Sequence, residues 1–274
     1  MFATQDQDNR RAEAPGLTRN HGAAARRLRR AAAGAVCAAA VALPVAGAAT
    51  AQAATAAPHT LAITWTSLAL ENGWADYGNH TAAPAVTKIN GIVHLRGAIP
   101  TAGATGEPFI LPAAFRPNHT VYVPVGLCNA NNGRLDIYPS GVVDVEAEGG
   151  AMANAECGTS LDGAWFAAST TSFTPLMLQN GWHNYTDGTV NAAVRKISGI
   201  VHLEGAIAGG TSPLAFTLPA GFRPAHNVYV SVDMNGANRG HVLIDSNGQV
   251  TVFAEGSPSV ASSFTSLDGV SFEP

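Results

Sequence analysis

Two histidines stand at matching places in the sequence and are the first candidates for chemistry. His94 lies in the phrase GIVHLRGAI, and His202 lies in the later phrase GIVHLEGAI. A histidine acts as a general base when a partner orients it and a nucleophile or water lies within hydrogen-bond reach. No Ser, Cys or carboxylate recurs beside both histidines, and the nearest charged neighbour changes from Arg96 to Glu204. We therefore expect both histidines to be structural.

Paired carboxylates, the second common catalytic set, are not kept between the two segments either. Glu71 and Asp76 are replaced by Gln179 and Asn184, so the segments share no carboxylate pair of the glycosidase kind. The chain also lacks HExxH, GxSxG, a phosphate-binding Gly-rich loop and a calcium-loop pattern. We expect a non-enzymatic protein with no catalytic residues, no cofactor and no metal site. A hydrolase with a site in only one segment is the weaker alternative.

Two aromatic pairs are stronger candidates for ligand binding. Trp74 with Tyr77, and Trp182 with Tyr185, lie beside Gly and polar residues where a strand is expected to run into a loop. Aromatic faces exposed at such a rim could stack on sugar rings or anchor a protein partner. Against this, a lone Trp in a β-domain usually belongs to the core. The exposure of the two Trp side chains distinguishes these alternatives.

These candidates recur because most of the sequence is present in two similar copies. The motif NGWxxY returns after 108 residues, LPAxFRP after 107 and SLDG after 106. A period of this length matches a whole domain and is too long for a solenoid unit. We interpret the chain as an internal duplication that forms two tandem domains, residues 54–168 and 169–274. The joint between them is short, so we expect the two copies to touch.

Short strands are the elements that must position these residues. Apolar residues alternate with period two over residues 121–125 and again over 228–232. A Gly-containing turn then joins two further strand-like segments, at residues 139–141 and 246–248, which is a strong hairpin signal. No amphipathic pattern of ten or more residues follows the first 53 residues. The sequence predicts an all-β fold of two β-sandwich or jelly-roll-like domains, with each GIVHL phrase as a core strand.

The beginning of the chain has the features of a secretory signal. Four arginines between Arg26 and Arg30 precede an apolar stretch from Ala31 to Ala49, and an A-x-A site ends at Ala53. This order predicts a signal peptide over residues 1–53 that is cleaved on export. No second apolar run follows, so we expect no membrane insertion after cleavage and a secreted, extracellular protein.

Removal of the signal changes the charge of the chain. The full chain has 15 Lys and Arg against 19 Asp and Glu, and seven of the former and three of the latter precede residue 54. The remaining chain therefore carries a formal charge of about −8. Nucleic acid is not an expected partner, because its binding depends on neutralising phosphates with Lys and Arg.

Two cysteines remain after the signal, Cys128 and Cys157. An even pair in an exported chain favours a disulfide over two free thiols. In the second copy Asn235 replaces Cys128, and Ser263 or Phe264 stands opposite Cys157, so both cysteines are absent together. The hairpin between the cysteines returns the chain toward its starting point. We predict a disulfide, with the two Cα atoms within about 7 Å of each other.

The motifs also occur in a familiar order: NGWxxY, KxxGIVHLxGAI, LPAxFRP, a Gly-turn hairpin and SLDGxxF. Over nearly all of both copies the chain resembles the C-terminal head domain of phage tail-fibre and receptor-binding proteins, and related modules of secreted actinobacterial proteins. The resemblance implies a β-sandwich used for surface recognition, often of carbohydrate, and often trimeric in phage. It transfers no binding residues to this chain.

These observations lead to an ordered set of expectations for function. The first is a secreted, non-enzymatic recognition protein that binds a surface glycan or a cell-surface protein. The alternative is a structural protein of the cell envelope or extracellular matrix that self-assembles, so oligomerisation stays open. The secreted hydrolase is the third and weaker reading.

Overall fold

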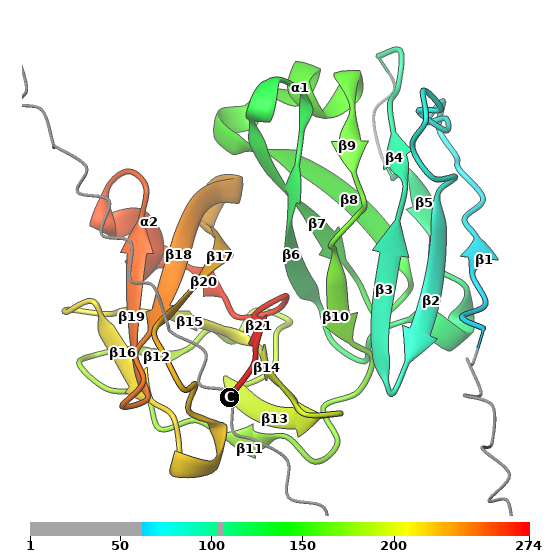
Figure 1. Ribbon diagram of the computed structural model, residues 1–274. Coiled ribbons are helices and arrows are strands. Elements are labelled where there is room, and N and C mark those ends of the chain that lie inside the picture. The colour runs from blue at the N-terminus through cyan, green and yellow to red at the C-terminus, as the bar shows by residue number, and fades with distance from the viewer. Residues whose placement is uncertain (1–61, 104–106) are drawn as a thin grey trace, which may run out of the picture. The chain divides into compact units, whose positions relative to one another are not determined.

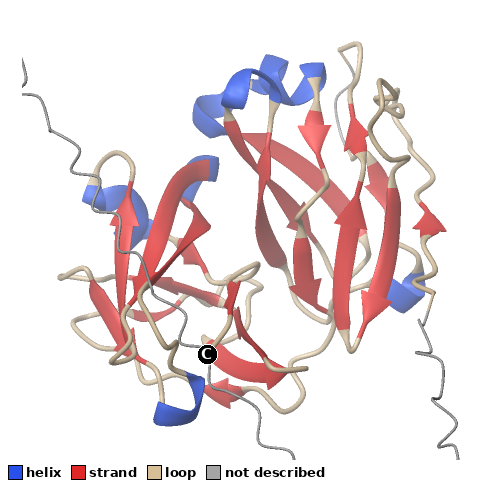
Figure 2. Ribbon diagram, in the orientation of Figure 1, coloured by secondary structure: helices blue, strands red, loops and turns tan. Residues whose placement is uncertain are grey.

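A computed structural model of the protein describes residues 62–103 and 107–274 (Figure 1). Nearly all regular structure within these residues is β-strand (Figure 2). Their only α-helices are the six-residue α1 (Met152–Cys157) and α2 (Pro258–Ser263), and the remaining helical segments are 3-10 turns. Neither described helix is long and apolar enough to span a membrane. The prediction of an all-β, sandwich-like fold is confirmed. The predicted signal peptide, residues 1–53, lies outside the described residues.

The first repeat, described from residue 62 to residue 168, contains two four-stranded antiparallel sheets and one two-stranded ladder. The sheets have the strand orders β1-β2-β3-β10 and β5-β8-β7-β6, and β4 pairs with β9. The elements are β1 (Thr66–Ser67), β2 (Ala85–Ile89), β3 (Ile92–Arg96), β4 (Ala98–Ile99), β5 (Phe109–Ile110), η1 (Ala113–Phe115), β6 (Val121–Gly126), η2 (Cys128–Ala130), β7 (Asn132–Ile137), β8 (Val142–Ala147), η3 (Glu148–Gly150), α1, β9 (Thr159–Ser160) and β10 (Trp165–Ala167).

The second repeat, residues 169–274, contains a four-stranded and a seven-stranded antiparallel sheet. Their strand orders are β11-β13-β14-β21 and β12-β15-β20-β17-β18-β19-β16. The elements are β11 (Thr174–Pro175), β12 (His183–Asn184), β13 (Ala193–Ile197), β14 (Ile200–Glu204), β15 (Ala206–Ala208), β16 (Leu214–Thr217), η4 (Ala220–Phe222), β17 (Val228–Met234), η5 (Asn235–Ala237), β18 (Asn238–Ile244), β19 (Gln249–Ala254), α2, β20 (Thr265–Ser266) and β21 (Ser271–Phe272).

The repeated phrase GIVHL forms β3 in one repeat and β14 in the other, and each strand starts from the same tight turn. Asn90 and Gly91 both have positive φ, of 52° and 89°, and Ser198 and Gly199 have 51° and 90°. Two consecutive residues with positive φ make the type I′ turn that fits the twist of a two-residue hairpin. The turns therefore fix the pairing of β2 with β3 and of β13 with β14.

The glycine that ends each phrase is required by a close backbone approach. A Cβ atom on Gly97 would lie 2.6 Å from the carbonyl oxygen of Ala82, and one on Gly205 would lie 2.6 Å from that of Val190. Both glycines also have positive φ, of 97° and 89°, a conformation that costs glycine little. The phrase is thus written twice because both copies need the same strand between the same two glycine positions.

Each repeat has its own hydrophobic core, although the described chain forms one compact unit. Alternate residues of β3 and β14 point into these cores, as the period-two pattern predicts: Val93 and Val201 are fully buried and Leu95 and Leu203 nearly so. Most segments of matching sequence form the same elements in both repeats, although the counterpart of β12 in the first repeat is only an isolated bridge between Trp74 and Thr101.

The disulfide between Cys128 and Cys157 is present, and this prediction is confirmed. It joins the start of η2 to the end of α1, and the two Cα atoms are 5.8 Å apart. The second repeat closes the same corner without a covalent bond, through the backbone hydrogen bond from Asn235 N to Phe264 O at 3.2 Å. The first repeat makes the equivalent bond, from Cys128 N to Gly158 O at 2.9 Å, so the disulfide adds a covalent link to a corner that both repeats close.

Reduction of the disulfide is expected to destabilise the first repeat. The bond closes a loop with a sequence separation of 29, so its removal should cost about 3 to 4 kcal/mol in the chain-entropy model. Amide hydrogen exchange with and without reductant measures this: protection should fall in β6 and β7 more than in β18 and β19. The C128S/C157S double variant should not respond to reductant. Equal loss of protection in both repeats would contradict the expectation.

Candidate binding site

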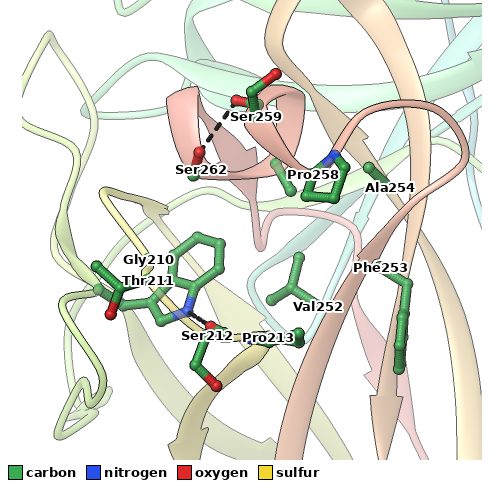
Figure 3. A pocket seen from close by; sticks show the side chains of 12 residues that line it. Gly210, Thr211, Ser212, Pro213, Val252, Phe253, Ala254, Pro258, Ser259 and Ser262 are labelled. Atoms are coloured by element: carbon green, nitrogen blue, oxygen red, sulfur yellow. Dashed lines mark hydrogen bonds between the residues drawn. The ribbon is translucent and has the colours of Figure 1, made fainter.

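A pocket of about 260 Å³ lies in the second repeat between the loop that follows β15, the end of β19 and helix α2 (Figure 3). Its lining combines apolar side chains with four hydroxyl-bearing residues and contains no ionisable side chain. The lining residues are Trp182, Gly210, Thr211, Ser212, Pro213, Val252, Phe253, Ala254, Pro258, Ser259, Ala261 and Ser262.

One wall of the pocket depends on Trp182 and on a glycine that lets the loop cover it. A Cβ atom on Gly210 would lie 2.0 Å from Cε2 of the Trp182 ring, so only glycine allows this approach without displacing the ring. The ring nitrogen of Trp182 donates a hydrogen bond of 2.8 Å to the carbonyl oxygen of Ser212 (Figure 3). The indole is therefore held by both packing and a hydrogen bond.

Helix α2 supplies a second wall, and its own sequence explains where it begins. The side chain of Ser257 caps the helix by accepting a hydrogen bond of 3.4 Å from Ser259 N, and Pro258 occupies the first turn. Ser262 donates to the carbonyl oxygen of Ser259 at 3.2 Å. The cap thus fixes a short helix that presents serine residues to the pocket.

Phe253 forms the outer wall from the end of β19. Its ring is 38% exposed and is stacked on His241, with ring centroids 5.1 Å apart. An aromatic ring held in this way offers an apolar face to a ligand at little further entropy cost. A site with apolar walls and a few hydroxyls suits a small amphipathic ligand, whereas it holds no side chain for acid–base chemistry.

A second, more open pocket of about 490 Å³ shares Ser262 with the first. Its lining is more polar and includes His183, Asn184, Tyr185 and Asp187. The two pockets together place an apolar site beside hydrogen-bonding side chains.

The structure corrects the prediction that the two tryptophans form an exposed aromatic platform. Trp74 and Trp182 are both only 6% exposed and belong to the two hydrophobic cores. The neighbouring Gly and polar residues indicated a rim, but each indole turns inward from it. Trp182 still contributes to the pocket wall. The prediction that a ligand stacks on the faces of these two indoles is therefore wrong.

The predicted tyrosines lie in different surroundings from each other. Tyr77 is 39% exposed. Tyr185 is half-buried, lines the second pocket and makes an edge contact with Phe264, with ring centroids 4.9 Å apart. Of the four predicted binding residues, Trp182 and Tyr185 thus line the two pockets of the second repeat.

The two histidines lie near each other but lack the surroundings of a general base. Burial, and to a smaller extent the nearby His94, lowers the pKa of His202 to about 4, and burial also lowers the pKa of His94. The His202 ring makes an edge contact with Trp165 at 4.7 Å. Its Nδ1 is buried without a hydrogen-bond partner in the described part of the chain. A base needs an orienting partner, so this geometry fits a packed, neutral histidine.

The repeated SLDG motif forms a turn in both repeats, and its aspartate also bonds to distant backbone amides. Asp268 accepts hydrogen bonds from Gly205 N at 3.1 Å and from Tyr122 N of the other repeat at 3.4 Å. Asp162 accepts the equivalent bond from Gly97 N at 3.0 Å. The carboxylates therefore tie together segments far apart in the sequence. Burial raises the pKa of Asp268 to about 7.

The two arginines of the LPAxFRP motifs hold their loops. The Nε atom of Arg116 donates to the carbonyl oxygen of Leu111 at 2.8 Å, and that of Arg223 donates to Leu218 at 2.9 Å. Each arginine therefore caps the loop of its own motif.

Comparison of the chain with family models, curated proteins and solved structures gives no match. The case for the site therefore comes from its geometry alone. Among the residues that the structure describes, no group of three or more His, Cys, Asp and Glu side chains is placed to hold a metal ion.

Sequence reasoning missed Phe253 and the serines of α2. The available signal was a difference between the copies: GSPSVASS in the second repeat replaces GGAMANAEC in the first. A capping Ser followed by Pro predicts a helix start, and only the second copy has it.

Two buried groups at the junction should give opposite pH dependences. Burial raises the pKa of Asp268 from 3.8 to about 7 on folding. Its contribution to the free energy of unfolding is therefore fully present below about pH 4 and is lost as the pH rises through 7. The pKa of His202 is lowered from 6.5 to about 4 on folding. Its contribution to the free energy of unfolding is therefore fully present above pH 6.5 and is lost as the pH falls through 4. Chemical unfolding between pH 4 and 7 should therefore show Asp268→Asn gaining stability relative to wild type as the pH rises.

His202→Gln should show the reverse, losing stability relative to wild type over the same range. Each slope is at most about 1.4 kcal/mol per pH unit for one proton. Slopes of the same sign for both variants would contradict these assignments.

Proposed function

We propose that the protein is a secreted, non-enzymatic recognition protein that binds a surface glycan through the pocket of the second repeat. The observation that carries the proposal is the pocket's lining, which places Trp182 and Phe253 beside the hydroxyls of Thr211 and Ser259 without any ionisable side chain. Sugars present both apolar C–H faces and hydroxyl groups, so they fit a wall of this composition.

The size of the pocket narrows the class of ligand. Pockets for drug-sized ligands have volumes of roughly 300 to 1,000 Å³, and this one has about 260 Å³. It suits one sugar unit, with the neighbouring polar pocket available to the next unit through Asn184 and Asp187. A terminal sugar of a surface glycan is therefore the favoured ligand, and a protein side chain is the alternative.

The charge and predicted export of the chain agree with this proposal. A negative net charge disfavours nucleic acid as a partner. The predicted signal peptide places the protein outside the cell, where surface glycans are found. The resemblance to tail-fibre head domains supports surface recognition from an independent direction.

Blocking the pocket should abolish selective glycan binding. The chain without residues 1–53 is applied to a glycan array, and wild type is expected to bind a small set of related glycans. Ser259 is exposed at the pocket wall, so Ser259→Trp should fill the pocket and weaken binding at least about tenfold, the loss of about 1.4 kcal/mol. Phe253→Ala should weaken it by a similar factor because it removes the outer apolar wall.

The matched control is Met177→Trp, which adds the same side chain at a position that is 81% exposed and outside the pocket lining. It should bind as wild type does. An array without selective hits, or equal binding by Ser259→Trp and Met177→Trp, would contradict the proposal.

A further inference from the structure

We propose that a second copy of this chain docks on strand β17 of the second repeat and repeats there the contact that joins the two repeats within one chain. The open strand is residues 226–230 of the second repeat, and the free loop is residues 160–163 of the first repeat. This proposal does not rest on glycan binding.

The contact within one chain shows what such docking requires. At the start of β6, Tyr122 N donates to Asp268 Oδ2 at 3.4 Å, and Ser266 Oγ donates to the carbonyl oxygen of Tyr122 at 2.7 Å. The Tyr122 ring makes an edge contact with Phe264, with centroids 5.0 Å apart. Thr120 N adds a hydrogen bond of 2.9 Å to Gly188 O. Strand and loop thus meet through backbone, side-chain and ring contacts together.

This contact buries the strand of the first repeat and leaves its counterpart uncovered. His119 and Val121 are 6% and 0% exposed in the first repeat. Their counterparts His226 and Val228 are exposed and half-buried. Tyr229, the counterpart of half-buried Tyr122, is 68% exposed. The open strand therefore keeps most of the same residue types, but instead of being covered it lines an open pocket together with residues 271–274.

The loop that would receive the open strand is also present and free. The free loop has the sequence SLDG, identical to residues 266–269 that receive Tyr122. Asp162 is exposed and already held by Gly97 N at 3.0 Å, as Asp268 is held by Gly205 N at 3.1 Å. Nearby Tyr77, 39% exposed, corresponds to Tyr185. Both halves of a second contact are therefore displayed on each chain.

Within one chain the open strand and the free loop do not contact each other, since both are exposed although the two repeats are already joined. A contact between two different surfaces is heterologous, and repeated between chains it closes a ring or extends a filament. A second copy is thus the occupant that carries the complementary surface.

Two differences make the contact between chains weaker than the one within a chain. Arg134 lies over the Tyr122 ring at 4.8 Å and reaches Asp233 of the other repeat at 3.3 Å. In the second repeat His241 stands in place of Arg134, and Gly158 of the first repeat stands opposite Phe264. The ion pair and one ring contact are therefore missing. We expect association that depends on concentration.

The test is sedimentation velocity on the chain without residues 1–53, over about a 100-fold range of concentration. The average mass is expected to rise from one chain toward two or more. Tyr229→Asp, on the open strand, and Ser160→Arg, in the free loop, should each weaken association at least about tenfold. Met177→Asp, at an exposed position outside both surfaces, should associate as wild type does. Circular dichroism checks folding, and Tyr77→Asp replaces Ser160→Arg if that variant does not fold.

Mixing the two variants gives the decisive result. Each variant alone keeps only one intact surface, so an equimolar mixture should form a dimer of the two different chains that neither forms alone. A chain that stays monomeric at every concentration would overturn the proposal. Association that survives both substitutions, or that mixing does not restore, would overturn it as well.

Discussion

One buried carboxylate, that of Asp268, bonds to both repeats at the junction between them. Asp268 is only 2% exposed. Its carboxylate accepts one hydrogen bond from each repeat, from Tyr122 N of the first and from Gly205 N of the second. A buried carboxylate is costly unless such donors satisfy it, and desolvation by burial still dominates its pKa, which rises to about 7. The position of the strand that starts at Val121 depends on this residue.

The same contact makes two copies of one sequence unequal. In this contact the first repeat contributes its outer strand, β6, and the second repeat contributes its SLDG loop. The SLDG loop of the first repeat and the outer strand of the second repeat, β17, therefore remain free. Asp162 and Asp268 occupy the same place in the motif, yet Asp162 is exposed and Asp268 is buried. Function can therefore differ between the copies, and the candidate glycan pocket belongs to the second repeat.

Much of the fold could be predicted from the sequence because it depends on local rules. Period-two alternation and the Gly-containing turns at residues 139–141 and 246–248 are short-range signals, and the strands and turns that they predict are present, as is the disulfide expected from the even pair of cysteines. Roles set by the tertiary surroundings were not predictable in this way. Trp182 is buried because a distant loop at Gly210 closes over it, and the local sequence NGWHNY does not show this. Asp268 lies in a local turn, closed by the bond from Val270 N to Leu267 O, but its carboxylate also bonds Tyr122, 146 residues away, which the local sequence does not show.

Amide hydrogen exchange at two matching tyrosines tests the unequal packing of the repeats most directly. Tyr122 and Tyr229 occupy the same register, opposite Asp136 and Leu243 on the neighbouring strand. In dilute solution the Tyr122 amide should be strongly protected from exchange, because it donates a hydrogen bond to Asp268 in the junction. The Tyr229 amide should exchange rapidly with solvent. Equal protection of the two amides would show that the repeats are packed equivalently and would contradict the account.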